Sequence, residues 1–258
     1  MTAIGILEAL RPNYAEAAQQ VQPNDARIRT ERVEIKSPEG NGVVKALVAK
    51  PANATGKLPT VVVIHENRGL NPHIEDVARR FAMANFMALA PDGLTSLGGY
   101  PGDDFKGGQM FMKVDGAKMA EDFVASAQWL KARSDCNGKV CATGFCYGGG
   151  VANNLAVRLG ADLAAAAPFY GAAPSAENAA KIKAAILVHH GELDTRLAAT
   201  WPTYDMQLKT AGVPHEGYIY PGAVHGFNCD DTPERYNKAA ADLAWQRTVD
   251  WFNKYARG

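Results

Sequence analysis

The sequence has no surplus of charge of either sign. Its 27 lysines and arginines balance 27 aspartates and glutamates, so the formal net charge at pH 7 is zero. Proteins that bind nucleic acids or anionic membrane surfaces use a basic excess, and we therefore expect neither partner. The chain also lacks an uninterrupted apolar run of about 18 residues, the length at which a membrane-spanning helix is predicted. With 47% hydrophobic residues, the composition is that of an ordinary globular domain.

Cysteine is scarce as well. The 258 residues include four, namely Cys136, Cys141, Cys146 and Cys229, which is too few for a disulfide scaffold in a chain of this length. No two of them form a C-x-x-C pair, and the spacing of five between the first three matches no usual zinc site. We therefore expect no metal ion.

The first 30 residues lack a strong hydrophobic periodicity. No basic segment precedes the mildly apolar stretch Met1–Leu10, so this stretch does not match a complete signal peptide. We expect residues 1–30 to form an N-terminal arm on a single domain that spans residues 31–258. We also expect a cytoplasmic protein, with the periplasm as the alternative if a longer native N-terminus carries an export signal.

From residue 32 onward, short apolar runs alternate with helical patterns. The runs at 32–35 and 43–49 flank a turn-forming segment and predict an antiparallel hairpin. The continuous β-branched run at 60–65 is typical of a strand buried on both faces. Further strands are predicted at 86–90, 139–143, 163–169, 184–189 and 216–220. Helices are predicted at 72–84, 116–133, 147–159, about 200–211 and 234–256, and an irregular glycine-rich excursion at 94–112.

This alternation predicts an α/β fold with a mostly parallel sheet, helices on both faces and an N-terminal antiparallel hairpin. Ligands and reacting side chains in such folds lie at the carboxyl ends of the strands. Segments that follow strands are therefore the places where functional residues are expected.

The segment Gly144-Phe145-Cys146-Tyr147-Gly148 has the pattern of a nucleophile elbow with cysteine as the nucleophile. A short strand leads into it and a helix follows. Such a turn brings together the residues two before and two after the nucleophile, so both have to be glycine. The alternative for Cys146 is a small buried hydrophobic residue, which is what most free cysteines are. For the other three cysteines we adopt that interpretation.

The predicted turn places Cys146 at the N-terminus of a helix. Free N–H groups and the positive end of the helix dipole favour a thiolate there. The backbone amide of Tyr147, the first on the helix, would point at a carbonyl oxygen that becomes negative. We therefore expect it to supply half of an oxyanion hole.

A nucleophile of this kind needs a histidine that moves protons, and the histidine comes last in the chain order of this fold. His225 is the candidate because it lies in a glycine-flanked loop after the last predicted strand. His189 and His190 end a strand, and His215 precedes one. The alternative for His225 is a loop histidine bonded to the backbone.

An acid has to orient that histidine, and it should follow the preceding strand. Asp194 fits this position, in the segment His190-Gly191-Glu192-Leu193-Asp194. Glu192 is its rival. The alternative for Asp194 is the cap of a short helix, a common use of aspartate.

These motifs resemble the dienelactone hydrolase family. The resemblance is carried by the elbow around Cys146, by Gly-Glu-Leu-Asp194 and by Gly-Ala-Val-His225-Gly-Phe, and it extends to residues 65–69 and 90–92. It covers roughly residues 30–256. The resemblance implies an α/β-hydrolase fold, a Cys-His-Asp triad, and hydrolysis of small carboxylic esters or lactones through a thioester, without a cofactor.

The resemblance also implies roles for the residues after the first central strand. Glu66 stands where the family has a glutamate that interacts with the resting thiol and helps to ionise it. An ion pair with Arg68 is the alternative, and both contacts can hold at once. Asn67 stands where the family's second oxyanion amide is supplied.

The chain departs from the family at the two arginines that bind a substrate carboxylate in its best-known members. Residues 226–230 and 94–112 contain no arginine. Arg68 and Arg196 are the substitutes that we expect. Trp201 and Phe227 are expected as further substrate contacts.

We therefore expect a monomeric or small homo-oligomeric enzyme that acts on a small-molecule ester or lactone. Two alternatives stay open. The same triad would serve a thioesterase or a peptidase, which differ in the pocket. An exposed thiolate is also oxidisable, which would suit a binding or redox-sensing protein with little catalysis.

Overall fold

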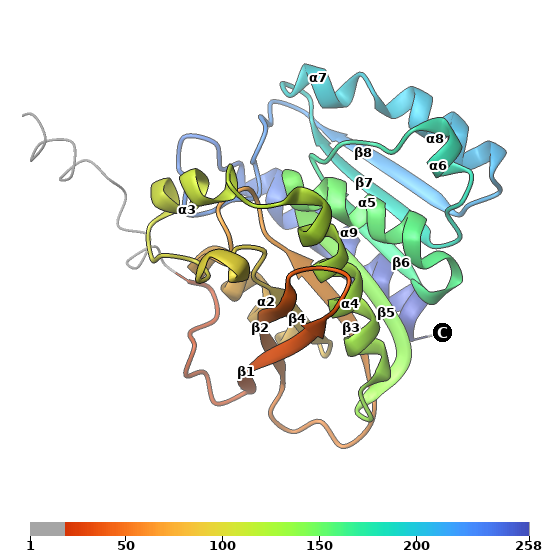
Figure 1. The fold of residues 1–258 in the computed structure, drawn as a ribbon. Helices are drawn as coiled ribbons and strands as arrows, with labels where there is room; N and C mark the ends of the chain where they lie inside the picture. The colour runs from red at the N-terminus through yellow and green to blue at the C-terminus, as the bar shows by residue number, and fades with distance from the viewer. Residues whose placement is uncertain (1–18, 258) are drawn as a thin grey trace, which may run out of the picture.

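The computed structural model describes residues 19–257, which form an eight-stranded sheet in the order β1-β2-β4-β3-β5-β6-β7-β8 (Figure 1). The strands are β1 (Ile28–Ser37), β2 (Gly42–Pro51), β3 (Leu58–Ile64), β4 (Met87–Pro91), β5 (Cys136–Phe145), β6 (Ala165–Phe169), β7 (Ala185–Gly191) and β8 (His215–Tyr220). The longer helices are α2 (Pro72–Met83), α3 (Asp104–Phe111), α4 (Gly116–Ala132), α5 (Tyr147–Leu159), α8 (Trp201–Thr210) and α9 (Lys238–Ala256). Single turns form η1 (Thr95–Leu97), η2 (Gly160–Asp162), α6 (Ala176–Ala179) and α7 (Thr195–Ala198).

The sheet has one antiparallel end and a parallel remainder. β1 and β2 pair as an antiparallel hairpin, and β2 also pairs antiparallel with β4. All pairs from β4 through β3, β5, β6 and β7 to β8 are parallel. The mostly parallel sheet and the N-terminal hairpin confirm the predicted fold class.

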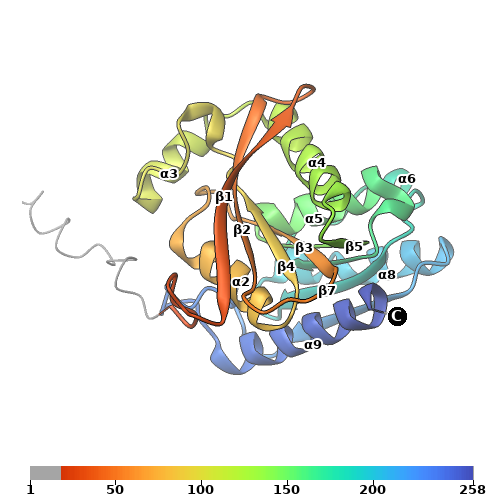
Figure 2. The same cartoon turned by 90° about the horizontal axis from the view of Figure 1, so that it is seen from below.

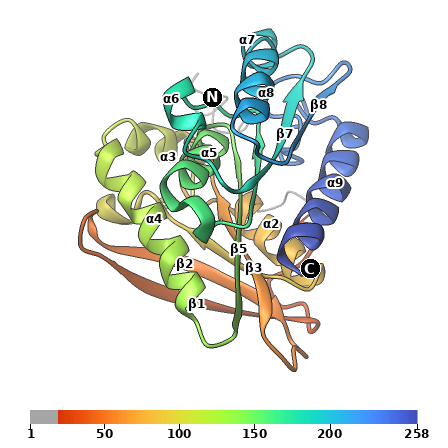
Figure 3. The ribbon, with the colours of Figure 1, turned by 90° about the vertical axis from the view of Figure 1, so that its right-hand side faces the viewer.

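Helices cover both faces of the sheet, because the central strands are apolar on both sides. Along β3, Val61 and Val63 belong to one buried cluster, and Val62 and Ile64 belong to the other. The first cluster also contains side chains of α2 and α9, and the second contains side chains of α4, α5 and α8. Figure 3 shows α9 and α2 on one side of the sheet and α4 and α5 on the other, and Figure 2 shows α9 running along its face. Each fully buried aliphatic side chain contributes about 1.5–3 kcal/mol, so the two clusters are the main stabilising contribution.

The structure differs from the sequence prediction in the segment 94–112. An irregular excursion was expected, but residues 104–111 form helix α3. The Asp103 side chain caps this helix by accepting a hydrogen bond from the Lys106 amide at 2.7 Å. The cap offsets part of the cost of Gly107 and Gly108 in a helix, and Gly107 lets the helix approach the Arg68 carbonyl, 2.3 Å from where a Cβ atom would lie.

Helix α9 begins four residues later than the predicted start at 234. The Asn237 side chain accepts a hydrogen bond from the Ala240 amide and so defines the helix start. Strand β5 is longer than predicted and already begins at Cys136. Strand β1 begins at Ile28, four residues before its predicted start and inside the expected arm of residues 1–30. The other predicted strands and helices occur close to their expected bounds.

The described part of the expected N-terminal arm packs on α2. The Asp76 carboxylate accepts hydrogen bonds from the backbone amides of Gln20 and Val21, and Arg79 donates to the Val21 carbonyl. Val21 itself is buried in the core. Residues 1–18 of the expected arm lie outside the described residues. No helix within residues 19–257 combines the length and apolarity that a membrane crossing requires.

Candidate active site

Four loops at the carboxyl ends of β5, β6, β7 and β8 carry the residues of the site. Cys146 follows β5 directly and Tyr170 follows β6. Asp194 lies between β7 and α7, and His225 lies in the loop after β8. Because these strands are parallel neighbours, their carboxyl ends lie at one edge of the sheet.

The backbone at Cys146 adopts the conformation of a nucleophile elbow. Its φ and ψ are 55° and −112°, a region that residues with a side chain rarely occupy. A Cβ atom on Gly144 would lie 2.1 Å from the carbonyl oxygen of Gly148, and a Cβ atom on Gly148 would lie 2.4 Å from that of Ile64. The two glycines are therefore required by close backbone approach.

Replacing Gly144 with alanine is expected to lower the free energy of unfolding by about 3 kcal/mol or more, because a Cβ atom would overlap backbone that cannot move aside. Gly116→Ala is the matched control. A Cβ atom at this exposed first residue of α4 meets no described atom within 4 Å. The control should change stability by no more than about 1 kcal/mol. Urea unfolding of both variants measures the difference, and equal stabilities would contradict the role assigned to Gly144.

His225 joins Cys146 to Asp194. Its Nδ1 lies 2.6 Å from Asp194 Oδ2, and its ring also interacts with the Cys146 side chain. The interaction with Cys146 and, next, the bond to Asp194 raise the pKa of His225 from 6.5 to about 9, although partial burial opposes the change. Nδ1 is thereby held by the acid while the other side of the ring serves the sulfur, which is the arrangement for proton transfer.

Glu192, the rival acid, has a different partner. Its Oε2 accepts a hydrogen bond from the Gly222 amide at 2.9 Å. The contact belongs to the loop that carries His225, so Glu192 supports the loop backbone while Asp194 holds the ring.

The other three candidate histidines have structural environments. His189 is fully buried between the hydroxyls of Tyr220 and Thr248, at 2.9 and 3.0 Å. His215 lies at the start of β8, where Asp205 is 3.2 Å from its Nε2. His190 is buried beside the site, and burial lowers its pKa to about 4, so it is neutral at pH 7.

Glu66 forms the ion pair that was its alternative interpretation. Arg68 donates to Glu66 at 2.7 Å and to Asp104 at 2.8 Å. Tyr100 donates to the other oxygen of Asp104 at 2.7 Å. Because Arg68 is 12% exposed and already holds two carboxylates, its guanidinium is engaged within the protein. The family role of Glu66 toward the thiol stays a prediction.

The two amides expected at an oxyanion hole come from the ends of β3 and β5. Tyr147 is the first residue of α5, where backbone N–H groups lack intrahelical carbonyl partners. Asn67 is exposed in the turn that follows β3. β3 and β5 are parallel neighbours in register, so both segments lie at the same edge of the sheet.

A cavity of about 350 Å³ opens beside the nucleophile candidate. It is lined by Ala120, Cys146, Tyr147, Gly150, Val151, Asn154 and Ala172. This lining is dominated by small and apolar side chains, so the cavity suits a small uncharged group. Arg196 lines a neighbouring hollow, with Ala172 common to both.

Two residues expected as substrate contacts take part in the packing of the domain. The Trp201 ring packs on β8, where a Cβ atom on Gly217 would lie 2.2 Å from it, and it also contacts His215 at the strand's beginning. That is the end of the sheet opposite Cys146. Phe227 is fully buried against Tyr170 and Tyr220. Both aromatic side chains therefore use apolar area in this packing, and their contact with a substrate stays a prediction.

Sequence reasoning missed Tyr170 and Arg235. The Tyr170 ring lies 5.0 Å from the His225 ring, and its backbone has a positive φ of 36°. Its position directly after β6 is the signal that could have found it. Arg235 lies beside Gly226, with Nη1 3.4 Å from the place of a Cβ atom there. No sequence motif marks this arginine, because the folding of the loop between β8 and α9 brings it close to Gly226.

His73, Cys229 and Asp231 form a group that could hold a metal ion. None of them belongs to the arrangement of Cys146, His225 and Asp194. The His73 ring nevertheless lies 6.2 Å from the ring of Phe145, the residue before Cys146, which places the group in the vicinity of the site.

Comparisons with known proteins all point to relatives of the dienelactone hydrolases. The model of the dienelactone hydrolase family matches residues 44–256. The "Putative hydrolase fragment YghX" of Escherichia coli K12 is 55% identical over 115 residues, which are 45% of this chain and 97% of that protein. A "Putative carboxymethylenebutenolidase" of Yersinia pestis is 30% identical over 232 residues, covering 84% of this chain and 86% of the relative.

A solved structure is similar over almost the same span. The crystal structure of a "Putative Dienelactone Hydrolase" from Klebsiella pneumoniae superposes with a TM-score of 0.76 at 29% identity. The alignment covers 88% of this chain and 99% of that one. The observed sheet order and the helices on both faces are thus shared with a protein of known structure.

Proposed function

The chain belongs to the dienelactone hydrolase family and has the α/β-hydrolase fold, and from this premise we propose that it cleaves small carboxylic esters or lactones with Cys146 as the nucleophile. The observation that carries the proposal is the grouping of Cys146, His225 and Asp194 beside a cavity that Cys146 lines, with His225 held by Asp194 at 2.6 Å and its pKa raised by Cys146. The strained elbow supports it independently, because such backbone strain persists where function requires it.

In the proposed reaction, the Cys146 thiolate attacks the acyl carbon of the substrate. The amides of Asn67 and Tyr147 stabilise the negative charge on the carbonyl oxygen. His225 donates its proton to the leaving oxygen, the carbon–oxygen bond breaks and a thioester with Cys146 forms. Water then attacks the thioester while His225 accepts its proton, the carbon–sulfur bond breaks, and the acid product is released as the Cys146 thiolate is restored.

The same contacts explain how His225 would act first as an acid and then as a base. The interaction with Cys146 is the largest cause that raises the pKa of His225 to about 9. Acylation turns the sulfur into a thioester, which interacts more weakly with the imidazole, so that cause weakens and the imidazole becomes available as a base. Asp194 holds the ring throughout.

We expect kcat/KM for an alkyl ester, whose alkoxide is a poor leaving group, to fall as pH rises through about 9, where His225 loses the proton that the leaving group needs. The raised pKa also predicts a change in stability. The contribution of protonated His225 is fully present below pH 6.5 and disappears as pH rises to about 9. A pH–rate profile, together with urea unfolding of the wild type and of His225→Gln, measures both effects. A rate that stays constant above pH 9 would contradict the assignment.

The engagement of Arg68 bears on the substrate. Because this arginine already pairs with Glu66 and Asp104, we propose that the preferred substrate carries no carboxylate beside its ester. The small apolar lining of the cavity supports the same choice.

A panel of neutral and carboxylated esters, lactones, thioesters and peptides, offered to the purified protein, tests the proposed function. Intact-protein mass spectrometry of the quenched reaction should show an acyl group on Cys146. If only thioesters or only peptides are turned over, the protein is a thioesterase or a peptidase instead. Absence of both turnover and acylation would contradict the proposal.

A further inference from the structure

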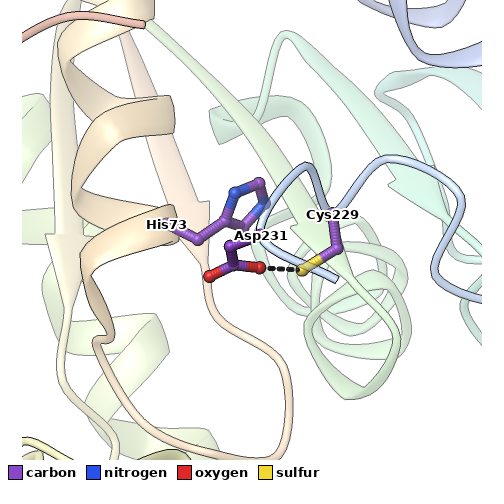
Figure 4. A group of neighbouring side chains, drawn as sticks. All are labelled: His73, Cys229 and Asp231. Atoms are coloured by element: carbon purple, nitrogen blue, oxygen red, sulfur yellow. Dashed lines mark hydrogen bonds between the residues drawn. The ribbon is translucent and has the colours of Figure 1, made fainter. Parts of the chain in front are cut away.

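We propose that His73, Cys229 and Asp231 form a binding site for a divalent transition-metal ion of the zinc type. His73 lies in the first turn of α2, and the other two residues lie in the loop between β8 and α9. One ligand atom from each residue lies within 4.8 Å of the others, and all three residues are buried. Figure 4 shows the three side chains pointing toward one another.

The orientation of His73 is that of a metal-binding histidine. Its Nδ1 lies 2.9 Å from Asp230 Oδ1, and Asp230 is held in turn by Arg80 at 2.5 Å. Metal-binding histidines commonly donate one ring N–H to a carboxylate in this way, which leaves a lone pair on the other nitrogen for the ion. The other nitrogen here, Nε2, has no hydrogen-bond partner within residues 19–257. The side chain is 2% exposed, so bulk water does not reach that nitrogen.

Asp231 adds a second unpaired atom to the same cluster. Its Oδ1 accepts a hydrogen bond from Cys229 Sγ at 2.7 Å, whereas its Oδ2 is buried without a partner among the described residues. Buried polar atoms are nearly always paired, because an unpaired one loses the hydrogen bonds of water without replacement. A single cation between the three side chains would satisfy both His73 and Asp231.

The donor set selects the class of ion. Thiolate sulfur, imidazole nitrogen and carboxylate oxygen together favour zinc or cobalt, whereas magnesium and calcium require oxygen ligands. Tetrahedral zinc bonds of about 2.0–2.3 Å place donor atoms roughly 3.3–3.7 Å apart. The three ligand atoms lie within 4.8 Å of one another, so side-chain adjustments of about 1 Å would bring them to that spacing. Binding releases the Cys229 proton to solvent, and the thiolate and Asp231 then neutralise the dication. A water molecule would complete a tetrahedral site.

The site would join two parts of the chain that meet near the candidate active site. His73 and Asp230 are 157 positions apart in the sequence. Cys229 and Asp231 lie in the same loop as His225, so a bound ion would fix that loop to α2. This role is independent of Cys146. The proposed site also departs from the expectation of no metal ion, which rested on cysteine spacing and could not register ligands that come from separate segments.

Cobalt is the probe for the test, since a cysteine thiolate bound to Co²⁺ gives a charge-transfer absorption in the near ultraviolet. The full chain is treated with a chelator, dialysed and titrated with Co²⁺. The titration uses the Cys146→Ala background, because Cys146 and His225 could also bind a soft cation. We expect one equivalent of Co²⁺ per chain, the thiolate band, and a higher unfolding temperature with Zn²⁺.

Cys229→Ser should abolish the band, and Asp230→Asn should weaken binding by about 10–100-fold by releasing the His73 ring. Cys136→Ser, which alters a buried cysteine at the start of β5, is the matched control and should keep the band. Unfolding of every variant in chelator separates loss of the site from loss of the fold. A wild type that binds no Co²⁺ and gains no stability from Zn²⁺, or a band that survives Cys229→Ser in a folded protein, would overturn the proposal.

Discussion

Cys146→Ala is expected to lower kcat/KM for an activated ester by about 10⁴-fold or more, because removing the nucleophile of a triad removes nearly all of its catalysis. The thiol is the group that the elbow presents to the cavity and that His225 contacts. Alanine has no atom that can form the thioester, and the acyl-enzyme should also disappear from the mass spectrum. The side chain is only partly buried, so the variant should remain folded.

Cys136→Ser is the matched control for this prediction. It also replaces a thiol, but one that is buried at the beginning of β5, at the end of the strand opposite Cys146. Its turnover should be close to that of the wild type. If Cys146→Ala retains wild-type turnover in the folded state, the cysteine mechanism is wrong, although family membership is unaffected.

Asp194→Asn is expected to lower kcat by about 10³–10⁴-fold, because an amide in this position favours the wrong tautomer of the histidine. The Asp194 carboxylate accepts from His225 Nδ1 at 2.6 Å and is 8% exposed. An asparagine there can donate an N–H to Nδ1, which would move the ring proton to the nitrogen that faces Cys146. The pH–rate profile of the variant should change along with its kcat.

Glu192→Gln separates the two acids. Glu192 accepts from the Gly222 amide, and a glutamine oxygen can accept the same hydrogen bond. Its kcat should therefore stay within about threefold of the wild type, as expected for a neutral change at a surface contact. A larger loss for Glu192→Gln than for Asp194→Asn would reverse the assignment of the acid.

The parts of the site that could be predicted are those with a local cause. The two glycines around Cys146 are demanded by backbone atoms within four residues, or by the adjacent strand, and this constraint is visible as a sequence pattern. Asp194 and His225 could be selected because the order of strands determines which loops meet at the carboxyl edge.

The parts that could not be predicted depend on packing between distant segments. Trp201 and Phe227 were expected near the substrate, but whether an aromatic ring faces a pocket or the core is decided by neighbours far along the chain. The ion pair between Arg68 and Asp104 forms because Asp104 is the first residue of helix α3. This helix was not predicted, because its sequence contains two glycines. The grouping of His73 with Cys229 and Asp231 corresponds to no spacing motif in the sequence, because His73 is far from the other two residues along the chain.

The bend at Cys146 is maintained without any help from its sulfur. The Cys146 amide donates to the Phe169 carbonyl at 3.1 Å, and the glycines at 144 and 148 allow the turn, so the main chain alone sets the pose. A hydroxyl nucleophile at position 146 would therefore face the His225 imidazole in the same way as the thiol. The main-chain geometry of the turn does not depend on sulfur, and Cys146→Ser should keep the same backbone while replacing the thiol with a hydroxyl.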